Sequence, residues 1–212
     1  MSKSGIQSET LGFMRAHGMD PQSLLPQIVR ERVYASRYWK EYCFGLDAET
    51  ILDKVKDIEC VGFCYGGFNT PSPFLCLLVK LLQISPDFGI IQAYLTHSSG
   101  YPVDDTDARR CDLRYLRALI CLYVRLVASP LAVYQILEPL LNDYRKLIVL
   151  TPTGHFEVMC MDEWISMLID GRERIVFGLV LPLLQARFHL EKKGLIHKYK
   201  GMLSADKGDE SP

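Results

Sequence analysis

Apolar residues recur at helical spacing along most of the chain, and in one stretch the polar face of the predicted helix almost disappears. The segment PFLCLLVKLLQI, residues 73–84, is interrupted only by Cys76, Lys80 and Gln83. A helix that is apolar nearly all round belongs at the centre of a fold, and this one is much shorter than the ~20 residues that a bilayer requires. We therefore predict a buried central helix over about residues 73–84, with Ser72 as its N-cap.

Further helices are predicted on both sides of this segment, because the apolar spacing continues between good capping residues, prolines and loops. They are expected to begin near Ser23, Asp47, Pro86, Arg109, Ser129, Asp162 and Arg172. The longest two span roughly 109–128 and 172–192, and the second is expected to be interrupted at Pro182. Pro139 should kink or close the helix that starts at Ser129.

One region has a different pattern. Residues 147–150 are LIVL, a Thr-Pro-Thr-Gly turn follows, and residues 155–160 alternate between polar and apolar. This pattern is typical of a β-hairpin over about 147–160. The predicted fold class is therefore mainly α: a single compact multi-helix domain around the buried helix at 73–84, with one small hairpin.

Composition sets the limits of this domain. The first and last segments are polar, so we expect a flexible N-terminal segment at 1–19, a helical domain at 20–200 and a flexible tail at 201–212. The net charge of −1 argues against a dedicated nucleic-acid binder. The chain does not open on an apolar signal segment, and its seven cysteines lie mostly in apolar runs, as in a reduced intracellular protein.

The glycine-rich loop before the central helix could suggest chemistry. Gly62, Gly66 and Gly67 lack the lysine of a phosphate-binding loop and no βαβ unit surrounds them, so we interpret them as sites of close backbone packing or of partner contact. Cys64 has no second cysteine pair at metal-binding spacing, and nothing places it beside a histidine. No catalytic residue, metal site or cofactor is predicted.

Two segments leave alternatives open. Residues 34–44 are rich in aromatic and basic residues and could stack RNA bases, but packing of Tyr38, Trp39, Tyr42 and Phe44 under the central helix is the favoured interpretation. Arg110, Arg114 and Arg117 fall on one face of the long predicted helix. That face could meet phosphates or an acidic partner helix, or could simply be solvated.

Several motifs in this chain resemble those of the pre-mRNA-splicing factor 38 family. They follow one another in the family's order over about residues 20–192, and the chain resembles a short form without the Arg/Ser-rich tail of many members. The motifs are IVRERVYASRYWKEYCFGL (28–46), YGGFNTPSPFLCLLVKLLQISP (65–86), DLRYLRALICLYVRL (112–126), LEPLLNDYRKL (137–147) and MDEW (161–164).

The resemblance implies a non-enzymatic scaffold protein in the nucleus, without cofactor or membrane contact. Family members associate with the U4/U6·U5 tri-snRNP or the pre-activation spliceosome, and are required for catalytic activation in pre-mRNA splicing. They dock helical segments of other spliceosomal proteins, including a zinc-finger splicing protein. The alternative function is direct, weak RNA binding through the basic helix face and the aromatic residues.

Partner-binding residues are expected at motif positions that look exposed. In the glycine-rich loop these are Tyr65, Gly66, Gly67, Phe68 and Asn69. On the basic helix face they are Arg110, Arg114 and Arg117, and in the fourth motif they are Asn142, Asp143, Tyr144 and Arg145.

Overall fold

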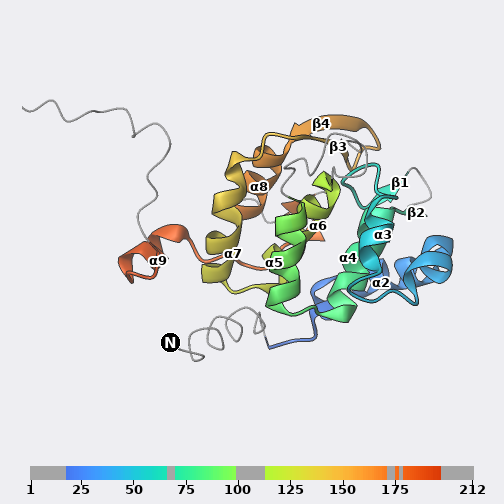
Figure 1. The fold of residues 1–212 in the computed structure, drawn as a ribbon, viewed down its shortest axis with the longest axis horizontal. Coiled ribbons are helices and arrows are strands. Elements are labelled where there is room, and N and C mark those ends of the chain that lie inside the picture. Colours follow the sequence, from blue (N-terminus) through green and yellow to red (C-terminus); the bar gives the residue numbers. More distant parts are fainter. Residues whose placement is uncertain (1–17, 66–69, 99–112, 171–174, 177–178, 197–212) are drawn as a thin grey trace, which may run out of the picture.

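The computed structural model describes residues 18–65, 70–98, 113–170, 175–176 and 179–196 (Figure 1). Its α-helices are α2 (Gln27–Ala35), α3 (Ile51–Val55), α4 (Pro73–Ile84), α5 (Phe88–His97), α6 (Arg114–Val127), α7 (Pro130–Leu137), α8 (Met161–Ile169) and α9 (Arg187–Lys192). Two 3₁₀ segments are η1 (Pro21–Leu24) and η3 (Glu138–Asn142), and a π-helical turn is η2 (Trp39–Cys43). Most of the predicted flexible ends lies outside the described residues.

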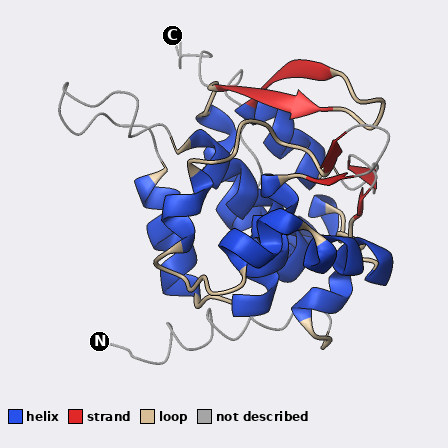
Figure 2. Cartoon of the chain, turned by 90° about the vertical axis from the view of Figure 1, so that its right-hand side faces the viewer, coloured by secondary structure: helices blue, strands red, loops and turns tan. Residues whose placement is uncertain are grey.

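The described strands form three antiparallel pairs: β1 (Cys64–Tyr65) with β2 (Thr70–Pro71), β3 (Lys146–Leu150) with β4 (Phe156–Cys160), and β5 (Ile175–Val176) with β6 (Leu179–Val180). Helices make up the body of the molecule, and the β3–β4 hairpin lies at one end of it (Figure 2). The mainly-α class and this hairpin are confirmed. The two-residue pairs β1–β2 and β5–β6 were not predicted.

The predicted central helix is α4. Every residue from Phe74 to Leu82 is buried, and the helix packs against η1, α2, η2, α3 and α6. Ser72 is the N-cap, as predicted: its Oγ accepts a hydrogen bond from the Leu75 N–H at 3.1 Å. The same hydroxyl donates to the carbonyl of Gly62 at 2.5 Å. The cap therefore ties the start of α4 to the preceding loop.

A second buried helix, α6, completes the core. Every residue from Leu116 to Val127 is buried, including two arginines. The Arg125 Nε donates to the Leu168 carbonyl at 2.7 Å, and its Nη2 donates to the Pro182 carbonyl at 2.8 Å. A cation at the carboxyl end of α8 is favourable because the last helix carbonyls carry partial negative charge.

The β3–β4 hairpin is joined to the loop before α4. The Val61 N–H donates to the Ile148 carbonyl at 2.8 Å, and the Leu150 N–H donates to the Val61 carbonyl at 2.7 Å, which forms a parallel bridge. Gly62 follows directly, and a Cβ at this position would lie 2.6 Å from the Leu150 Cβ. Of the three glycines interpreted as packing sites, Gly62 is confirmed, while Gly66 and Gly67 lie outside the described residues.

The prediction of one last helix over roughly 172–192 is wrong. The described part of this segment contains β5, β6 and an extended stretch, and only Arg187–Lys192 is α-helical. The β-branched residues Ile175, Val176 and Val180 favour strands, and Pro182 cannot donate the backbone hydrogen bond that a continuous helix needs. Apolar spacing alone did not distinguish these patterns.

Other predicted helix starts also move. The helix expected from Asp47 begins at Ile51, with Thr50 as its N-cap. Residues near Ser23 form η1, and α2 begins only after Pro26, which is its N-cap. The N-cap of α8 is Cys160 rather than Asp162, because the Glu163 carboxylate accepts the Cys160 N–H at 2.9 Å in a capping box.

Tyr123 provides a test of how the core tolerates a polar atom. This residue is fully buried on α6, and its hydroxyl forms no hydrogen bond with any part of the chain that the structure describes. Leaving a buried hydroxyl unpaired costs about 1–3 kcal/mol. We expect Tyr123→Phe to leave the free energy of unfolding unchanged or raise it by about 1 kcal/mol, measured by urea denaturation.

The matched control is Tyr134→Phe. Tyr134 is also buried, but its hydroxyl donates to the Gln185 carbonyl at 3.1 Å. Losing this bond should lower stability by about 1 kcal/mol. A Tyr123→Phe variant that lost as much as Tyr134→Phe would contradict the assignment of an unpaired hydroxyl.

Candidate functional site

A buried cluster of charges joins α5, α6 and the approach to β3. The Arg117 Nη1 donates to the Asp143 Oδ2 at 3.0 Å, and its Nη2 donates to the Leu95 carbonyl at 3.1 Å. The Arg145 Nη2 donates to the same Asp143 oxygen at 2.5 Å and to the Ser98 carbonyl at 2.7 Å. We call these three side chains, Arg117, Asp143 and Arg145, the Arg–Asp cluster.

The cluster keeps its charges although it is largely enclosed. Burial raises the pKa of Asp143, but the hydrogen bonds and charges of Arg145 and Arg117 outweigh this effect and lower the pKa below its usual value. Burial also lowers the pKa of Arg117, against the opposing charge of Asp143. A guanidinium still remains charged at neutral pH, so the cluster contains two cations that share one carboxylate.

The cluster corrects part of the predicted interaction surface. Arg117 was expected on an exposed helix face, but only 6% of it is exposed, and the Asp143 side chain is equally enclosed. Arg114 is half-buried and its Nη1 donates to the Lys146 carbonyl at 2.8 Å, so it does not form an exposed stripe with Arg117. Helical spacing could not show which elements cover Arg117.

The remaining predicted partner-binding residues are exposed, paired in a strand, or outside the described residues. Asn142 and Tyr144 are exposed, in accordance with the expectation, and Tyr144 exposes 62% of its surface. The backbone of Tyr65 pairs with Thr70 in β1–β2. Residues 66–69 and Arg110 lie outside the described residues.

The aromatic segment is divided between core and surface. Trp39 is buried against Tyr34, with ring centroids 5.0 Å apart, and the Lys80 ammonium lies 5.8 Å from the Trp39 ring. Tyr42 is exposed, with the Lys54 ammonium 4.6 Å above its ring. The packing interpretation is therefore confirmed for Trp39.

Phe44 departs furthest from that interpretation, because 77% of its surface is exposed. Its backbone, rather than its ring, makes the contact with the central helix: the Lys80 Nζ donates to the Phe44 carbonyl at 2.9 Å. The prediction that this ring packs under α4 is wrong, since the carbonyl holds the segment and leaves the side chain outside.

Three of the described cysteines are unfavourable nucleophiles. Burial raises the pKa of Cys43 to about 12 and of Cys76 to about 11, and it also raises the pKa of Cys64. A thiol that stays protonated at neutral pH reacts slowly, because the thiolate is the nucleophilic form. Among the described residues, no group of histidine, cysteine and acidic side chains is arranged to hold a metal ion.

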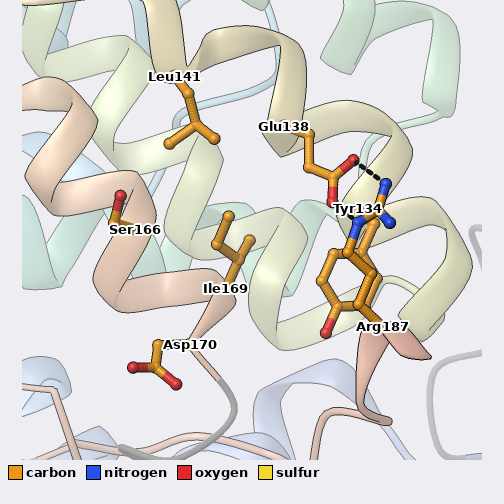
Figure 3. Close-up of a pocket in the computed structure, with 7 residues that line it drawn as sticks. All are labelled: Tyr134, Glu138, Leu141, Ser166, Ile169, Asp170 and Arg187. Atoms are coloured by element: carbon orange, nitrogen blue, oxygen red, sulfur yellow. Dashed lines mark hydrogen bonds and ion pairs between the residues drawn. The ribbon is translucent and has the colours of Figure 1, made fainter. Parts of the chain in front are cut away.

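A surface pocket lies between α7, η3, α8 and the start of α9 (Figure 3). It has a volume of about 420 Å³ and is lined by Tyr134, Glu138, Leu141, Ser166, Ile169, Asp170 and Arg187. The Arg187 Nε donates to the Glu138 Oε1 at 2.5 Å on one side of it. Leu141 and Ile169 supply the apolar lining, and the Asp170 carboxylate stands at the rim. Such a site suits an apolar side chain.

A second surface was missed entirely. Ile148, Phe156 and Val158 on the β3–β4 hairpin expose 44%, 62% and 68% of their surface. β4 was predicted from its alternating pattern and β3 from its β-branched apolar residues, but neither pattern says whether one face of the hairpin or both are covered. The only signal in the sequence was the excess of large apolar residues over the number that one covered face requires.

None of the helices in the described residues combines the length and hydropathy needed to cross a bilayer.

Comparison with known proteins gives concordant matches. The model of the PRP38 family matches residues 14–194. Pre-mRNA-splicing factor 38A of Xenopus laevis is 42% identical over 193 residues, and that of Homo sapiens is 40% identical over 193 residues. Each alignment covers 91% of this chain but only 57% of the relative, so the chain spans little more than half the length of these proteins.

A solved structure matches the fold. A chain in the crystal structure of the Snu23–Prp38–MFAP1(217–258) complex of Chaetomium thermophilum superposes with a TM-score of 0.78 at 34% identity. The superposition covers 88% of this chain and 90% of that chain.

Proposed function

This chain belongs to the PRP38 family, and on that premise we propose that it is a non-enzymatic scaffold of the spliceosome, acting in the nucleus. The observation that carries the proposal is the likeness to a chain of a three-protein assembly of splicing factors.

The proposal includes the finer role that the sequence resemblance implies. The chain associates with the U4/U6·U5 tri-snRNP or the pre-activation complex and is required for catalytic activation in pre-mRNA splicing. Its partners are spliceosomal proteins, one of them a zinc-finger protein, and they dock through helical segments. Exposed Asn142 and Tyr144 contribute to this surface, as do Arg110 and residues 65–69.

We propose that one such helix docks at the pocket shown in Figure 3. A helix presents apolar side chains three and four residues apart, and the space beside Leu141 and Ile169 can receive one of them.

The Ser166→Arg variant tests whether a partner helix docks at this pocket. Ser166 is exposed on α8 and lines the pocket, so a long cation there fills the space without altering the core. In pull-downs from nuclear extract with the tagged chain, we expect U4, U5 and U6 RNAs and their proteins to be recovered with the wild type. Recovery of at least one protein should fall about tenfold with Ser166→Arg, as for a central interface position.

Gln92→Arg is the matched control, because Gln92 is exposed on α5, away from the pocket. It should recover the same proteins as the wild type. Equal recovery with both variants would exclude the pocket, and recovery of no splicing protein by the wild type would contradict the scaffold function itself.

RNA binding is the second candidate, favoured by the exposure of Phe44 and of Tyr42, whose ring centroid lies 4.6 Å from the Lys54 ammonium. Exposed rings can stack on unpaired bases. Gel-shift titration with U4/U6 duplex should show only weak binding that disappears with added salt. Tight binding at physiological salt that Phe44→Ala abolishes would favour RNA recognition over the scaffold role.

A further inference from the structure

The two edges of the β3–β4 hairpin differ. In an antiparallel pair, alternate residues direct their backbone groups to the partner strand and the others direct them outward. On β3, the outward groups of Ile148 and Leu150 are bonded to Val61, and the Ile148 N–H also donates to the Tyr115 hydroxyl at 3.3 Å. Arg114 donates to the carbonyl of the first residue of β3. This edge is closed.

The edge of β4 is open. Its residues Glu157 and Met159 lie opposite Val149 and Leu147 in the bonded positions of the ladder, so the backbone groups of Phe156 and Val158 point outward. The structure gives those outward groups no hydrogen-bond partner in the described part of the chain. In Figure 1, β4 is the outer strand of the hairpin.

The side chains of β4 do not protect this edge. Exposed edge strands usually carry lysine, proline or a bulge, which discourage another strand from pairing. The sequence of β4 is FEVMC, without any of these, and Phe156 and Val158 are more than half exposed beside Ile148. An unpaired edge flanked by apolar side chains is the arrangement used in strand addition, where an extended peptide joins a sheet.

The charges around this edge select the peptide. Glu157 lies on β4, and Asp162 and Glu163 lie in the first turn of α8, which follows the strand directly. Lys146 is the one basic residue within β3 or β4. Acidic residues therefore outnumber basic ones along β4, which favours a basic segment.

We propose that the free edge of β4 binds an extended segment of a partner protein, in which apolar residues alternate with lysine or arginine. The segment pairs with the outward backbone groups of Phe156 and Val158 and extends the Val61–β3–β4 sheet by one strand. This inference rests on the scaffold function proposed above and adds a binding mode to it. The pocket of Figure 3 receives a helix, whereas this edge accepts only an extended chain.

The Val158→Pro variant tests the edge directly. The Val158 N–H points away from β3, so proline removes an outward donor without removing a bond of the hairpin. Val158→Thr is the control, because threonine is β-branched and keeps the N–H. A displayed library of random dodecapeptides is selected on the wild type alone, and binding of the recovered peptides is then measured on the wild type and on each variant.

The expected result is enrichment of peptides with alternating apolar and basic residues. These peptides should bind Val158→Thr with the same affinity as the wild type. Compared with the wild type, they should bind Val158→Pro at least tenfold more weakly and Glu157→Lys several-fold more weakly. Hydrogen exchange at the Phe156 and Val158 amides should slow at least tenfold when such a peptide is bound.

Several outcomes would overturn the proposal. These are no enrichment, peptides that bind Val158→Pro equally well, and peptides with helical spacing of apolar residues. Sedimentation of the wild type as a dimer and of Val158→Pro as a monomer would assign the edge to a second copy instead. Pull-downs separate this inference from the scaffold function: equal recovery of splicing proteins by wild type and Val158→Pro rejects the edge alone.

Discussion

Replacing Asp143 with asparagine should lower the free energy of unfolding by about 3 kcal/mol, because removing one partner of a buried ion pair leaves the other charge uncompensated. Asp143 is the only carboxylate in the Arg–Asp cluster, and its oxygens accept hydrogen bonds from both Arg117 and Arg145. An asparagine has the same shape but leaves two guanidinium groups facing each other. Urea denaturation of the two proteins measures the difference.

The double variant Asp143→Asn with Arg117→Met is the control. Methionine removes the more deeply buried cation, so the double variant should recover a substantial part of the lost stability. If Asp143→Asn alone lowered the free energy of unfolding by less than about 1 kcal/mol, the cluster would contribute no more than exposed ion pairs do, and the prediction would be wrong.

The same carboxylate should make the protein sensitive to acid. Asp143 has a lowered pKa in the folded state, so its stabilising contribution is fully present above the unfolded pKa of about 3.9. The contribution is lost as the pH falls through the folded pKa. The Asp143→Asn variant should therefore lose less stability than the wild type between about pH 5 and pH 3.

Replacing Gly62 should be the other strongly destabilising change. A Cβ at this position would lie 2.6 Å from the Leu150 Cβ and 3.1 Å from the Leu150 carbonyl oxygen. Neither atom is the far end of a flexible side chain, so β3 or the loop before α4 has to move. We expect Gly62→Ala to lower stability by about 2–3 kcal/mol, within the range for overpacked sites, and Gly62→Val to prevent soluble expression.

Gly45→Ala is the matched control, since a Cβ at Gly45 would have no atom within 4 Å. Its midpoint of thermal unfolding should match that of the wild type or rise slightly, because alanine restricts the unfolded chain. If Gly62→Ala unfolded at the same temperature as Gly45→Ala, the close contact between the loop and β3 would be disproved.

The parts of the fold that sequence reasoning predicted are those in which local pattern and burial agree. Residues 73–84 are apolar on all sides, so no alternative placement competes with the centre of the fold. Ser129 and Pro130 start α7 as predicted, with the Ser129 hydroxyl accepting the Ala132 N–H, and helix geometry changes to 3₁₀ at Pro139. These are short-range effects that the residues themselves determine.

The wrong predictions concern residues whose burial or exposure depends on contacts with distant parts of the chain. Arg117 looks like a solvent-facing residue in helical spacing, but its carboxylate partner lies 26 residues further along the chain. Phe44 looks like a core residue, but its backbone forms the hydrogen bonds while most of its side chain is exposed. The open edge of β4 depends on what covers the neighbouring strand, namely Val61, and no local pattern encodes that contact.

The Arg–Asp cluster has a consequence for insertions into this chain. Its arginines donate hydrogen bonds to the carbonyls of Leu95, in the last turn of α5, and of Ser98, the residue after α5. Arg117 itself lies near the start of α6. The cluster therefore holds the end of α5 against the start of α6. These hydrogen bonds do not depend on the number of residues that connect the two helices. Doubling the length of a flexible connection costs only about 0.6 kcal/mol. An insertion there should therefore change the stability of the junction between α5 and α6 only slightly.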